Sequence, residues 1–350
     1  MSQKPNFAAF LNAPGAKLTV SEAPTPIPSP GEVLVRNHAV ALNPLDWKRQ
    51  AFDIFIPSYP TILGADLAGE IISSDSASPY PAGTRVAGVT HALSSGNLSN
   101  SAFQNYTAIK ISSLIPLPAS IPYTQGATLA TSTGTAALIL YDLLSIPLPS
   151  LTTGPSITGI PPTLLVWGGS SAIGTMAIQL AKLSGVQNII AAASGKHHGR
   201  LRSLGATTVV DYSSPSAVED VVAAIEKGGR EAPLYVVDPV SSPKSAAPVV
   251  EVLKRVGAGS GTKVANTLPW PAGLDVPEGV QVSGVAAQDL WGRREDLATW
   301  LFGEALPKWL GEGEIVPVKA RVVEGGLKGI QKGLEELMRG VSGEKLVVEL

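Results

Sequence analysis

The stretch TLLVWGGSSAIGTMAIQLAKLSG, residues 163–185, decides the fold predicted for this chain. A mostly apolar run leads into Gly169-Ser170-Ser171-Ala172-Ile173-Gly174, and a segment with helical spacing follows. A G-x-G-x-x-G-like string is informative when it joins a strand to a helix in this way. We expect the first glycine to allow the tight turn and the last to let the helix pack against the strand. Backbone N–H groups and the hydroxyls of Ser170 and Ser171 can then bind a pyrophosphate, although Ser171 stands where a middle glycine is usual.

Strand-like and helical segments alternate from Pro162 onward. The expected strands are rich in apolar and β-branched residues and lie at 163–167, 188–194, 206–212, 234–240, 262–268 and 280–286. The helical candidates between them lie at 172–185, 196–205, 216–229 and 244–257. Such alternation, with nearly all-apolar strands, is typical of a parallel sheet covered on both faces. A ligand-free strand–turn–helix is therefore a weaker interpretation of the glycine–serine cluster than a dinucleotide site.

The first 125 residues have a different pattern. Short apolar or β-branched segments, such as 31–42, 83–89 and 105–111, are separated by Pro and Gly, which predicts a compact antiparallel, barrel-like domain. Residues 125–144 have the composition of a helix, and residues 145–162 contain five prolines and are expected to form a loop. Two amphipathic helices, at 293–313 and 326–340, and a strand at 344–350 are expected to follow the alternating region.

The composition of the 350 residues excludes several classes of function. A net charge of −2, with acids and bases interspersed, offers no electrostatic footprint for nucleic acid. No uncharged apolar run approaches the roughly 20 residues of a spanning helix, and no secretory signal begins the chain, so we expect a cytoplasmic protein with no membrane partner. The lack of cysteine removes disulfides and thiolate zinc sites. The four histidines lack a metal-binding spacing, so we expect no metal site.

The end of the second predicted strand indicates which dinucleotide the cluster holds. A dehydrogenase that prefers NAD usually has an Asp or Glu at this point, which accepts the ribose hydroxyls. Residues 168–210 contain no Asp or Glu, and the strand ends in AAASGKHHGRLR. This segment offers hydroxyl, ammonium, imidazole and guanidinium donors for a 2′-phosphate from Ser194, Lys196, His197, His198 and Arg200. A solvated basic helix start is the alternative, and we favour NADP(H).

With these residues in place, the chain resembles the medium-chain dehydrogenase/reductase superfamily over nearly its whole length. The matching segments occur in the family's order: PSPGEVLVRNHAVALNPLDWK (29–48), ILGADLAGEI (63–72), GTRVAGV (83–89), VWGGSSAIG (166–174), SLGATTVVDY (203–212) and SGEKLVVEL (342–350). The resemblance implies an α/β fold in which a GroES-like β-barrel catalytic domain (1–126 and 289–350) accompanies a Rossmann domain with a doubly wound parallel sheet (127–288). It also implies an active site in the cleft between the two domains.

The resemblance further implies a reductase that works without zinc. Zinc alcohol dehydrogenases of this superfamily use a cysteine, a histidine and a further ligand, whereas the corresponding regions here read NPLDWK and GADLAGE. Zinc-free members are quinone and enoyl reductases, which pass a hydride from NADPH to a quinone or to the β-carbon of an activated double bond. Among them the chain is most similar to fungal trans-acting enoyl reductases and to ToxD-like and CipB-like proteins. Such proteins belong to polyketide and secondary metabolism.

Three residues are candidates for the chemistry of conjugate reduction. Lys48 can offer an ammonium to a developing enolate or to a substrate phosphate or carboxylate. Asn43 and Thr135 are polar groups in segments that line the family's cleft. Each has a structural alternative, because Lys48 can be a surface lysine and Asn43 and Thr135 can bond to local backbone. Tyr106 has no spacing that marks it as a proton donor, so the donor of the proton stays open.

The family match assigns further residues to the cofactor. It places Tyr212 near the adenosine phosphate, Asp238 and Val240 near the nicotinamide, Asn266 or Thr267 after the next strand, and Lys345 beside the cofactor in the last strand. Asp238 can also be a simple strand-end cap. Trp270 and Trp291 are expected in loops, where they can shape an apolar tunnel or pack in a core.

Three functions remain open at this stage. The first is an NADPH-dependent reductase of an enoyl thioester or enone, which can act in trans with a polyketide synthase that presents the substrate on an acyl carrier protein. The second is a reductase of quinones or free enones that needs no protein partner. The third is a non-redox cyclase or binding protein that keeps the fold. The oligomeric state, monomer or homodimer, also stays open, as do the substrate and its chain length.

Overall fold

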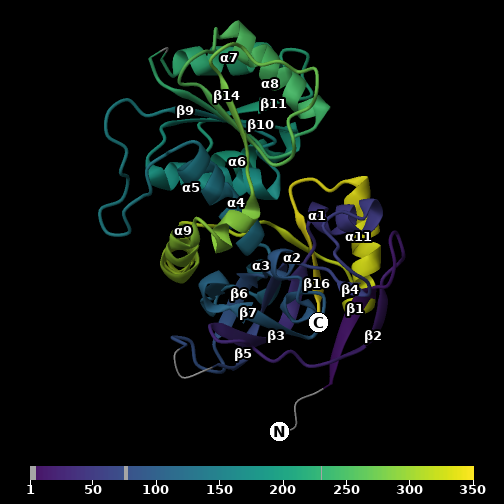
Figure 1. Cartoon of the computed structure of the whole chain (residues 1–350). Helices are drawn as coiled ribbons and strands as arrows, with labels where there is room; N and C mark the ends of the chain where they lie inside the picture. The colour runs from purple at the N-terminus through teal and green to yellow at the C-terminus, as the bar shows by residue number, and fades with distance from the viewer. Residues whose placement is uncertain (1–4, 75–77, 230) are drawn as a thin grey trace. The chain divides into compact units, whose positions relative to one another are not determined.

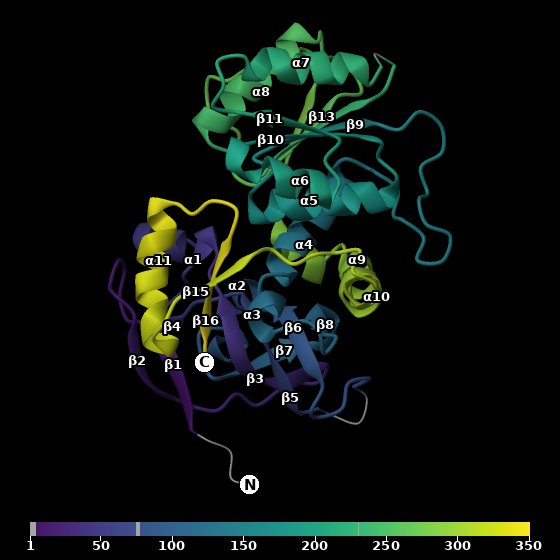
Figure 2. The ribbon, with the colours of Figure 1, turned by 180° about the vertical axis from the view of Figure 1, so that it is seen from behind.

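The structure is a computed structural model that describes residues 5–74, 78–229 and 231–350. The chain forms two compact units. Unit 1 contains Met1–Thr131 and Gln288–Leu350, and unit 2 contains Ser132–Ala287. Figures 1 and 2 show that the first and last parts of the chain, purple and yellow, come together in unit 1. No helix in the described ranges is long and apolar enough to cross a membrane.

Unit 2 is built around a six-stranded parallel sheet. The strand order is β11-β10-β9-β12-β13-β14, so the chain starts in the middle and winds outward in both directions. The strands of this sheet are β9 (Thr163–Trp167), β10 (Asn188–Ala193), β11 (Thr208–Asp211), β12 (Leu234–Asp238), β13 (Lys263–Asn266) and β14 (Gln281–Gly284). The prediction of a doubly wound parallel sheet is confirmed.

Helices cover both faces of this sheet. Both views place α5 and α6 on one face and α7 and α8 on the other (Figures 1 and 2). Their bounds are α5 (Ala172–Ser184), α6 (His198–Leu204), α7 (Ala217–Lys227) and α8 (Pro243–Arg255). Strands such as β9, which is buried along its whole length, require cover on both sides because their side chains are apolar on both faces.

Unit 1 is mainly antiparallel, as expected. A seven-stranded sheet has the order β15-β16-β3-β5-β6-β8, with β7 paired to β3, and a three-stranded sheet has the order β2-β1-β4. The strands are β1 (Asn6–Leu11), β2 (Thr19–Ala23), β3 (Glu32–Ala41), β4 (Thr61–Ile62), β5 (Asp66–Ser73), β6 (Arg85–Val89), β7 (Tyr106–Lys110), β8 (Leu114–Pro116), β15 (Ala320–Val322) and β16 (Lys345–Glu349). The last strand completes this unit, because β16 lies between β15 and β3.

The helices of unit 1 are short. They are α1 (Pro44–Phe52), α2 (Ala92–Ser95), α3 (Tyr123–Gly126), α9 (Glu295–Trp300), α10 (Leu306–Glu312) and α11 (Gly329–Arg339). A π-helical segment, Leu301–Ala305, joins α9 to α10, so the helix expected at 293–313 is interrupted. Short 3₁₀ turns occupy Leu98–Asn100, Ile111–Ser113 and Gly326–Lys328 in unit 1, Gly195–His197 in unit 2, and Ala287–Trp291 where the chain returns from unit 2 to unit 1. Helix α11 covers the apolar core of the unit with Ile330 and Leu334, both fully buried or nearly so.

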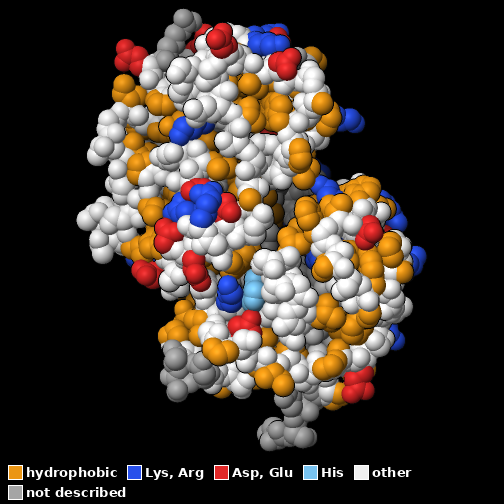
Figure 3. Space-filling view, in the orientation of Figure 1, with side chains coloured by type: hydrophobic (Ala, Val, Ile, Leu, Met, Phe, Trp, Pro, Cys, Tyr) orange, Lys and Arg blue, Asp and Glu red, His pale blue; other side chains and the backbone are white. Residues whose placement is uncertain are grey.

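The segment 125–144 is not one continuous helix. Helix α3 ends at Gly126, α4 runs over Ala130–Ala137, and a π-helical segment follows at Leu138–Leu143. The hydroxyl of Thr128 donates to the carbonyl of Gln125 at 2.7 Å, and such local bonds compete with helical hydrogen bonding. This is a physical reason for the break. On the face in Figure 3, acidic and basic side chains lie interspersed among apolar and neutral ones, as the small net charge leads one to expect.

Candidate functional site

The turn between β9 and α5 has the geometry of a phosphate cradle. Gly168 has φ +102°, a conformation that residues with a Cβ rarely adopt, whereas Gly169 has no positive φ. The prediction that Gly169 makes the tight turn is therefore wrong by one residue. A Cβ on Gly169 would lie 3.0 Å from Cβ of Ala191, and one on Gly174 would lie 2.5 Å from the carbonyl oxygen of Gly168. These two glycines thus allow close approach, the first to the neighbouring strand and the second to the turn itself.

The first turn of α5 carries the donors for an anion. Ser171 is the N-cap, and its hydroxyl accepts a hydrogen bond from the N–H of Gly174 at 3.0 Å. The carbonyl of Ser171 accepts the N–H of Thr175. The N–H groups of Ala172 and Ile173 have no acceptor within a helix, because the first turn lacks preceding carbonyls. They point with the positive end of the helix dipole, which suits a phosphate.

The basic segment after β10 lies beside an acid that the sequence pattern did not indicate. Lys196 is exposed, and the ring Nε2 of His198 lies 3.1 Å from the carbonyl oxygen of Ala193. Asp211, at the end of the neighbouring strand β11, accepts the N–H of Gly195 at 3.2 Å. Hydrogen bonds from Ser213 hold the pKa of Asp211 below its ordinary value, so it is a carboxylate at neutral pH. Asp211 directly follows the acid-free stretch 168–210 and ends β11, the third strand, whereas the acid of an NAD-preferring dehydrogenase ends the second strand.

The remaining predicted residues of this segment border the same strand ends. Ser194 begins the 3₁₀ turn after β10, and Arg200 lies in the first turn of α6. Tyr212 follows β11 directly and is 45% exposed. A 2′-phosphate bound here would therefore meet cations from one strand end and one carboxylate from the next.

Asp238 ends β12 and organises the loop that follows. Its carboxylate accepts the N–H groups of Val240 (3.0 Å) and Ser241 (2.9 Å) and the hydroxyl of Ser245 (2.8 Å). Burial raises its pKa. Asp238 thus makes the strand-end cap that was its structural alternative. The hydrogen bond to its N–H holds Val240 in place. Val240 lies against the glycine turn, since a Cβ on Gly168 would be 3.0 Å from its Cγ2.

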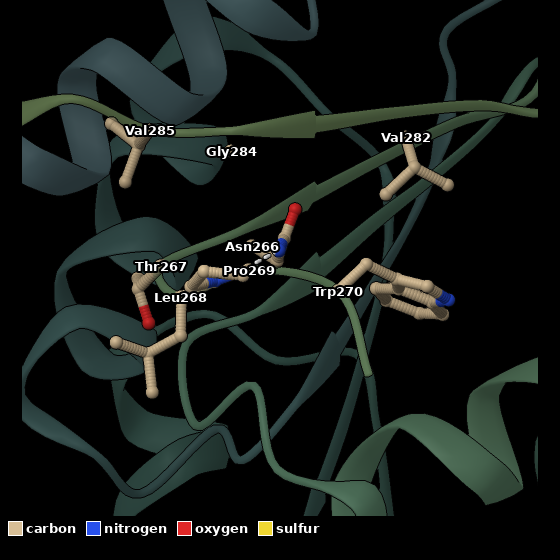
Figure 4. Close-up of a pocket in the computed structure, with 8 residues that line it drawn as sticks. All are labelled: Asn266, Thr267, Leu268, Pro269, Trp270, Val282, Gly284 and Val285. Carbon is tan, nitrogen blue, oxygen red and sulfur yellow. Dashed lines mark hydrogen bonds between the residues drawn. The ribbon is translucent and has the colours of Figure 1, made fainter. Parts of the chain in front are cut away.

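A pocket of about 440 Å³ lies at the ends of β13 and β14 (Figure 4). Its lining is mostly apolar and comes from Asn266, Thr267, Leu268, Pro269, Trp270, Val282, Gly284 and Val285. Asn266 is buried, its amide nitrogen donates to the carbonyl of Leu268, and its amide oxygen has no hydrogen-bond partner. The indole N–H of Trp270 donates to the carbonyl of Leu274. An unpaired buried acceptor beside an apolar pocket suits a ligand with an N–H donor.

In unit 1 the structure brings two predicted residues together around an acid that was not predicted. Asp66, fully buried at the start of β5, accepts hydrogen bonds from Asn43 (2.9 Å) and from the hydroxyl and N–H of Thr131 (2.7 and 2.9 Å). The oxygen that accepts from Asn43 also pairs with the ammonium of Lys345, which is 5% exposed. Lys345, which was expected beside the cofactor, is therefore part of a buried ion pair in unit 1. An acid within the apolar run ILGADLAGEII was a signal for such a pair.

Asn43 is the N-cap of helix α1, and Lys48 lies in the middle of the helix. The N–H of Asn43 donates to the carboxylate of Asp46 at 2.8 Å, and burial raises the pKa of Asp46 to about 6. Lys48 is half-buried, burial lowers its pKa, and no ion pair involves it within the described ranges. Thr135 is buried in α4 and belongs to unit 2. Trp291 is held in unit 1, where its indole N–H donates to Ser113.

These residues do not make a zinc site. The chain has no cysteine, and the oxygens of Asp66 are occupied by Asn43, Thr131 and Lys345. Within the described residues, no group of three or more His, Cys, Asp or Glu side chains is placed to hold a metal ion. A soft or imidazole-rich donor set is what protein zinc requires. The buried ammonium of Lys345, and not a metal, balances the charge of Asp66.

The chain matches two family models. Residues 29–119 match the alcohol dehydrogenase GroES-like domain, and residues 172–276 match the zinc-binding dehydrogenase domain. A trans-enoyl reductase of Aspergillus japonicus, himH, is 35% identical over 91% of this chain and 90% of its own length. The zinc-binding alcohol dehydrogenase domain-containing protein cipB of Emericella nidulans is 30% identical over 99% of this chain and 98% of its length. An alcohol dehydrogenase superfamily protein from Novosphingobium aromaticivorans has the same fold, with a TM-score of 0.77, 24% identity and 99% coverage of both chains.

Proposed function

Because this chain belongs to the medium-chain dehydrogenase/reductase family and is an oxidoreductase of its enoyl-reductase type, we propose that it is an NADPH-dependent, zinc-independent reductase of an activated C=C bond. Members of the family typically bind NAD(P). The proposed substrate is a 2-enoyl thioester or a related enone. NADPH supplies the hydride that is transferred to the β-carbon.

The observation that carries this proposal is the charge balance around Asp66. Alcohol oxidation in this fold needs a Lewis acid to polarise the alcohol oxygen. Here the buried carboxylate is neutralised by Lys345 and hydrogen-bonded by Asn43 and Thr131, which leaves no ligand set for a metal. Reduction of an enoyl group requires only a fixed hydride donor, a stabilised enolate oxygen and a proton.

The residues of unit 2 are proposed to bind the cofactor. The N–H groups of Ala172 and Ile173 and the hydroxyls of Ser170 and Ser171 hold the pyrophosphate. Ser194, Lys196, His198 and Arg200 hold the 2′-phosphate, and Tyr212 packs beside it. At the other strand ends, Asp238 fixes Val240, and the unpaired amide oxygen of Asn266 would be available to accept a hydrogen bond from the nicotinamide group.

In unit 1, Lys48 is proposed to stabilise the enolate oxygen. Its ammonium has lost part of its hydration, so its interaction with a developing negative charge is stronger than at an open surface. Asn43 is held by Asp46 and Asp66 and is proposed to orient the substrate next to Lys48. Thr135, which is buried in α4, is the third residue proposed for the reaction. Lys345 is proposed to act through Asp66 as a positioning residue.

The printed name of the himH relative supports a trans-acting role. We propose that the substrate arrives on an acyl carrier protein of a polyketide synthase, because that relative is named a trans-enoyl reductase. A carrier-bound chain would make free thioesters poorer substrates.

The test is oxidation of NADPH by the purified chain, followed by absorbance. The acceptors are a short 2-enoyl thioester of coenzyme A, the same acyl group on an acyl carrier protein, a simple quinone and no acceptor, with NADH as the cofactor control. We expect turnover of the thioesters with NADPH, more efficient on the carrier protein. Turnover of the quinone alone would contradict the proposed substrate class, and equal rates with NADH would contradict the cofactor preference.

A further inference from the structure

Helix α1 has its polar and apolar faces exchanged. Its buried residues are Asp46, Arg49 and Gln50. Leu45, Lys48 and Phe52, spaced i, i+3 and i+7, lie along another face, where Leu45 is 36% and Phe52 is 63% exposed. A surface helix normally turns its apolar stripe to the core and its charges to water. The exposed face of α1 therefore lacks the cover that its apolar side chains require.

The buried polar face prevents the helix from rotating to hide the apolar one. Asp46 accepts the N–H of Asn43 at 2.8 Å. The guanidinium of Arg49 donates to the carbonyl of Phe55 at 3.2 Å. The amide of Gln50 donates to Ala16 and to Gln331, both at 2.8 Å, and so ties α1 to α11. Rotation of α1 about its axis would break these hydrogen bonds, at a cost that burial of the exposed apolar side chains cannot offset.

The loop after α1 adds a second exposed aromatic ring and holds it in a strained backbone. Asp53 has φ +54° and Phe55 has φ +56°, a region that residues with a Cβ rarely adopt. The hydroxyl of Tyr59 donates to Asp53 at 2.5 Å, and Arg49 holds the carbonyl of Phe55. Phe55 is nevertheless 66% exposed. Strain of this kind persists where the surrounding contacts impose it, and it is concentrated at functional sites.

Charge and aromatic rings follow each other along this surface. The ammonium of Lys48 lies 5.7 Å from the ring centroid of Trp47, and the rings of Trp47 and Phe52 meet edge to face at 5.7 Å. Lys48 has no acidic partner in the described part of the chain. In Figure 3, apolar side chains cover much of the region where Figure 1 draws α1 and α11, with basic side chains at its margin and an acidic one within it. The surface thus offers one cation followed by an apolar track.

We propose that Leu45, Phe52 and Phe55, together with Trp47, which is partly buried against the core of unit 1, bind the acyl chain of the substrate, with the thioester carbonyl directed to Lys48. We name these four residues the acyl track. This inference rests on the proposed enoyl-thioester substrate and adds a preference for long apolar chains. Polarity selects the occupant, because the thioester carbonyl oxygen carries a partial negative charge, which grows to a full enolate charge on hydride transfer, and the acyl chain is apolar.

The experiment measures binding of saturated acyl-coenzyme A thioesters to the full chain by calorimetry, so that no turnover is needed. The ligands are the butyryl, octanoyl and dodecanoyl thioesters. We expect affinity to rise with chain length, since each buried methylene favours binding by roughly fourfold. The variants are Phe52→Gln, which keeps a good helix former, and Phe55→Asn, which tolerates the left-handed backbone.

Both variants are expected to weaken dodecanoyl binding about tenfold or more and to leave butyryl binding within about twofold. Ile27→Asn is the matched control, because Ile27 is an 86% exposed apolar residue of unit 1 outside the acyl track, and it should change neither affinity. Equal affinity for all three ligands in the unchanged chain would overturn the proposal. So would equal losses for butyryl and dodecanoyl in both variants, or a loss of self-association in the variants, which would assign the surface to a second copy of the chain.

The two proposals can fail separately. Binding that depends on chain length but leads to no oxidation of NADPH by any 2-enoyl thioester would refute the proposed reaction alone. Turnover of enoyl thioesters without any chain-length dependence of binding would refute the acyl track alone.

Discussion

At the scale of single residues, the cofactor preference depends on a few side chains after β10. The basic residues Lys196, His198 and Arg200 follow the end of β10. The carboxylate of Asp211, at the end of β11, accepts the N–H of Gly195. A carboxylate close to a 2′-phosphate would repel it, and the cations must outweigh that repulsion for NADPH to be preferred. The balance of these charges is therefore open to a direct test.

Replacing Lys196 by Ala is expected to weaken NADPH binding by about 10-fold or more and to leave NADH binding unchanged. A hydrogen bond between an ammonium and a phosphate contributes roughly 1.5–3 kcal/mol, and NADH lacks the 2′-phosphate. The measurement is fluorescence titration of both nucleotides. Lys182→Ala, on α5, is the control and should change neither affinity. Equal weakening of NADPH and NADH by Lys196→Ala would show that this lysine does not contact the 2′-phosphate.

Asp46 makes the stability of the protein depend on pH. Burial raises its pKa from the ordinary 3.8 to about 6, so the folded protein holds this proton more tightly than the unfolded chain does. The resulting stability is fully present below pH ~3.8 and is lost as the pH rises through about 6, with an amplitude on the order of 3 kcal/mol. In Asp46→Asn, which keeps an acceptor for the N–H of Asn43, this loss should disappear. Unfolding free energies measured from pH 4 to 7 check it, and parallel curves for the two proteins would refute it.

At the scale of elements, the ion pair between Asp66 and Lys345 joins β5 to β16. These strands come from opposite ends of the chain, and both side chains are almost completely buried. The same carboxylate receives Asn43 from the start of α1 and Thr131 from α4. One buried charge thus connects β5, β16, the start of α1 and Thr131, and its energetic role follows from the cost of leaving a charge unpaired.

Lys345→Met is expected to reduce the free energy of unfolding by about 3–5 kcal/mol, because it leaves the carboxylate of Asp66 buried without a cation. The double variant Asp66→Asn with Lys345→Met removes both charges and should recover part of this loss. Denaturant unfolding of the two variants and the unchanged protein is the measurement. If the double variant were less stable than Lys345→Met by the full cost of a second loss, the two residues would not be energetically coupled.

At the scale of the whole molecule, the discontinuous unit 1 surrounds the sequence of unit 2. The chain leaves unit 1 after Thr131 and returns at Gln288, and the returning segment supplies β15, β16 and α11. The polar residues proposed for catalysis and for cofactor binding are divided between the two units. The metal content is a property of the whole chain, and it tests the proposal that the reaction needs no zinc.

The purified protein is expected to contain far less than one zinc ion per chain. With no cysteine and no placed group of three metal-binding side chains among the described residues, a chelator should remove nothing that activity or thermal unfolding depends on. The measurement is elemental analysis before and after dialysis against the chelator. Stoichiometric zinc, or a lower melting temperature after dialysis, would contradict the absence of a metal site.

The sequence by itself determined the parallel sheet, the alternation of strands and helices along the chain, the glycine turn before α5 and the family. These depend on local pattern, because apolar strands, glycines and helix caps act within a few residues of each other. The position of the positive φ, at Gly168 and not Gly169, needed the actual course of the turn.

Only the tertiary structure decided how distant polar residues pair. Asp66 meets Lys345 across 279 positions, and Asp211 meets Gly195 from a neighbouring strand. The reversed faces of α1 also became visible only when burial was known, since helical spacing does not say which face turns inward. Pairing and burial are set by the packing of the whole chain, where a buried charge is tolerated only next to its partner.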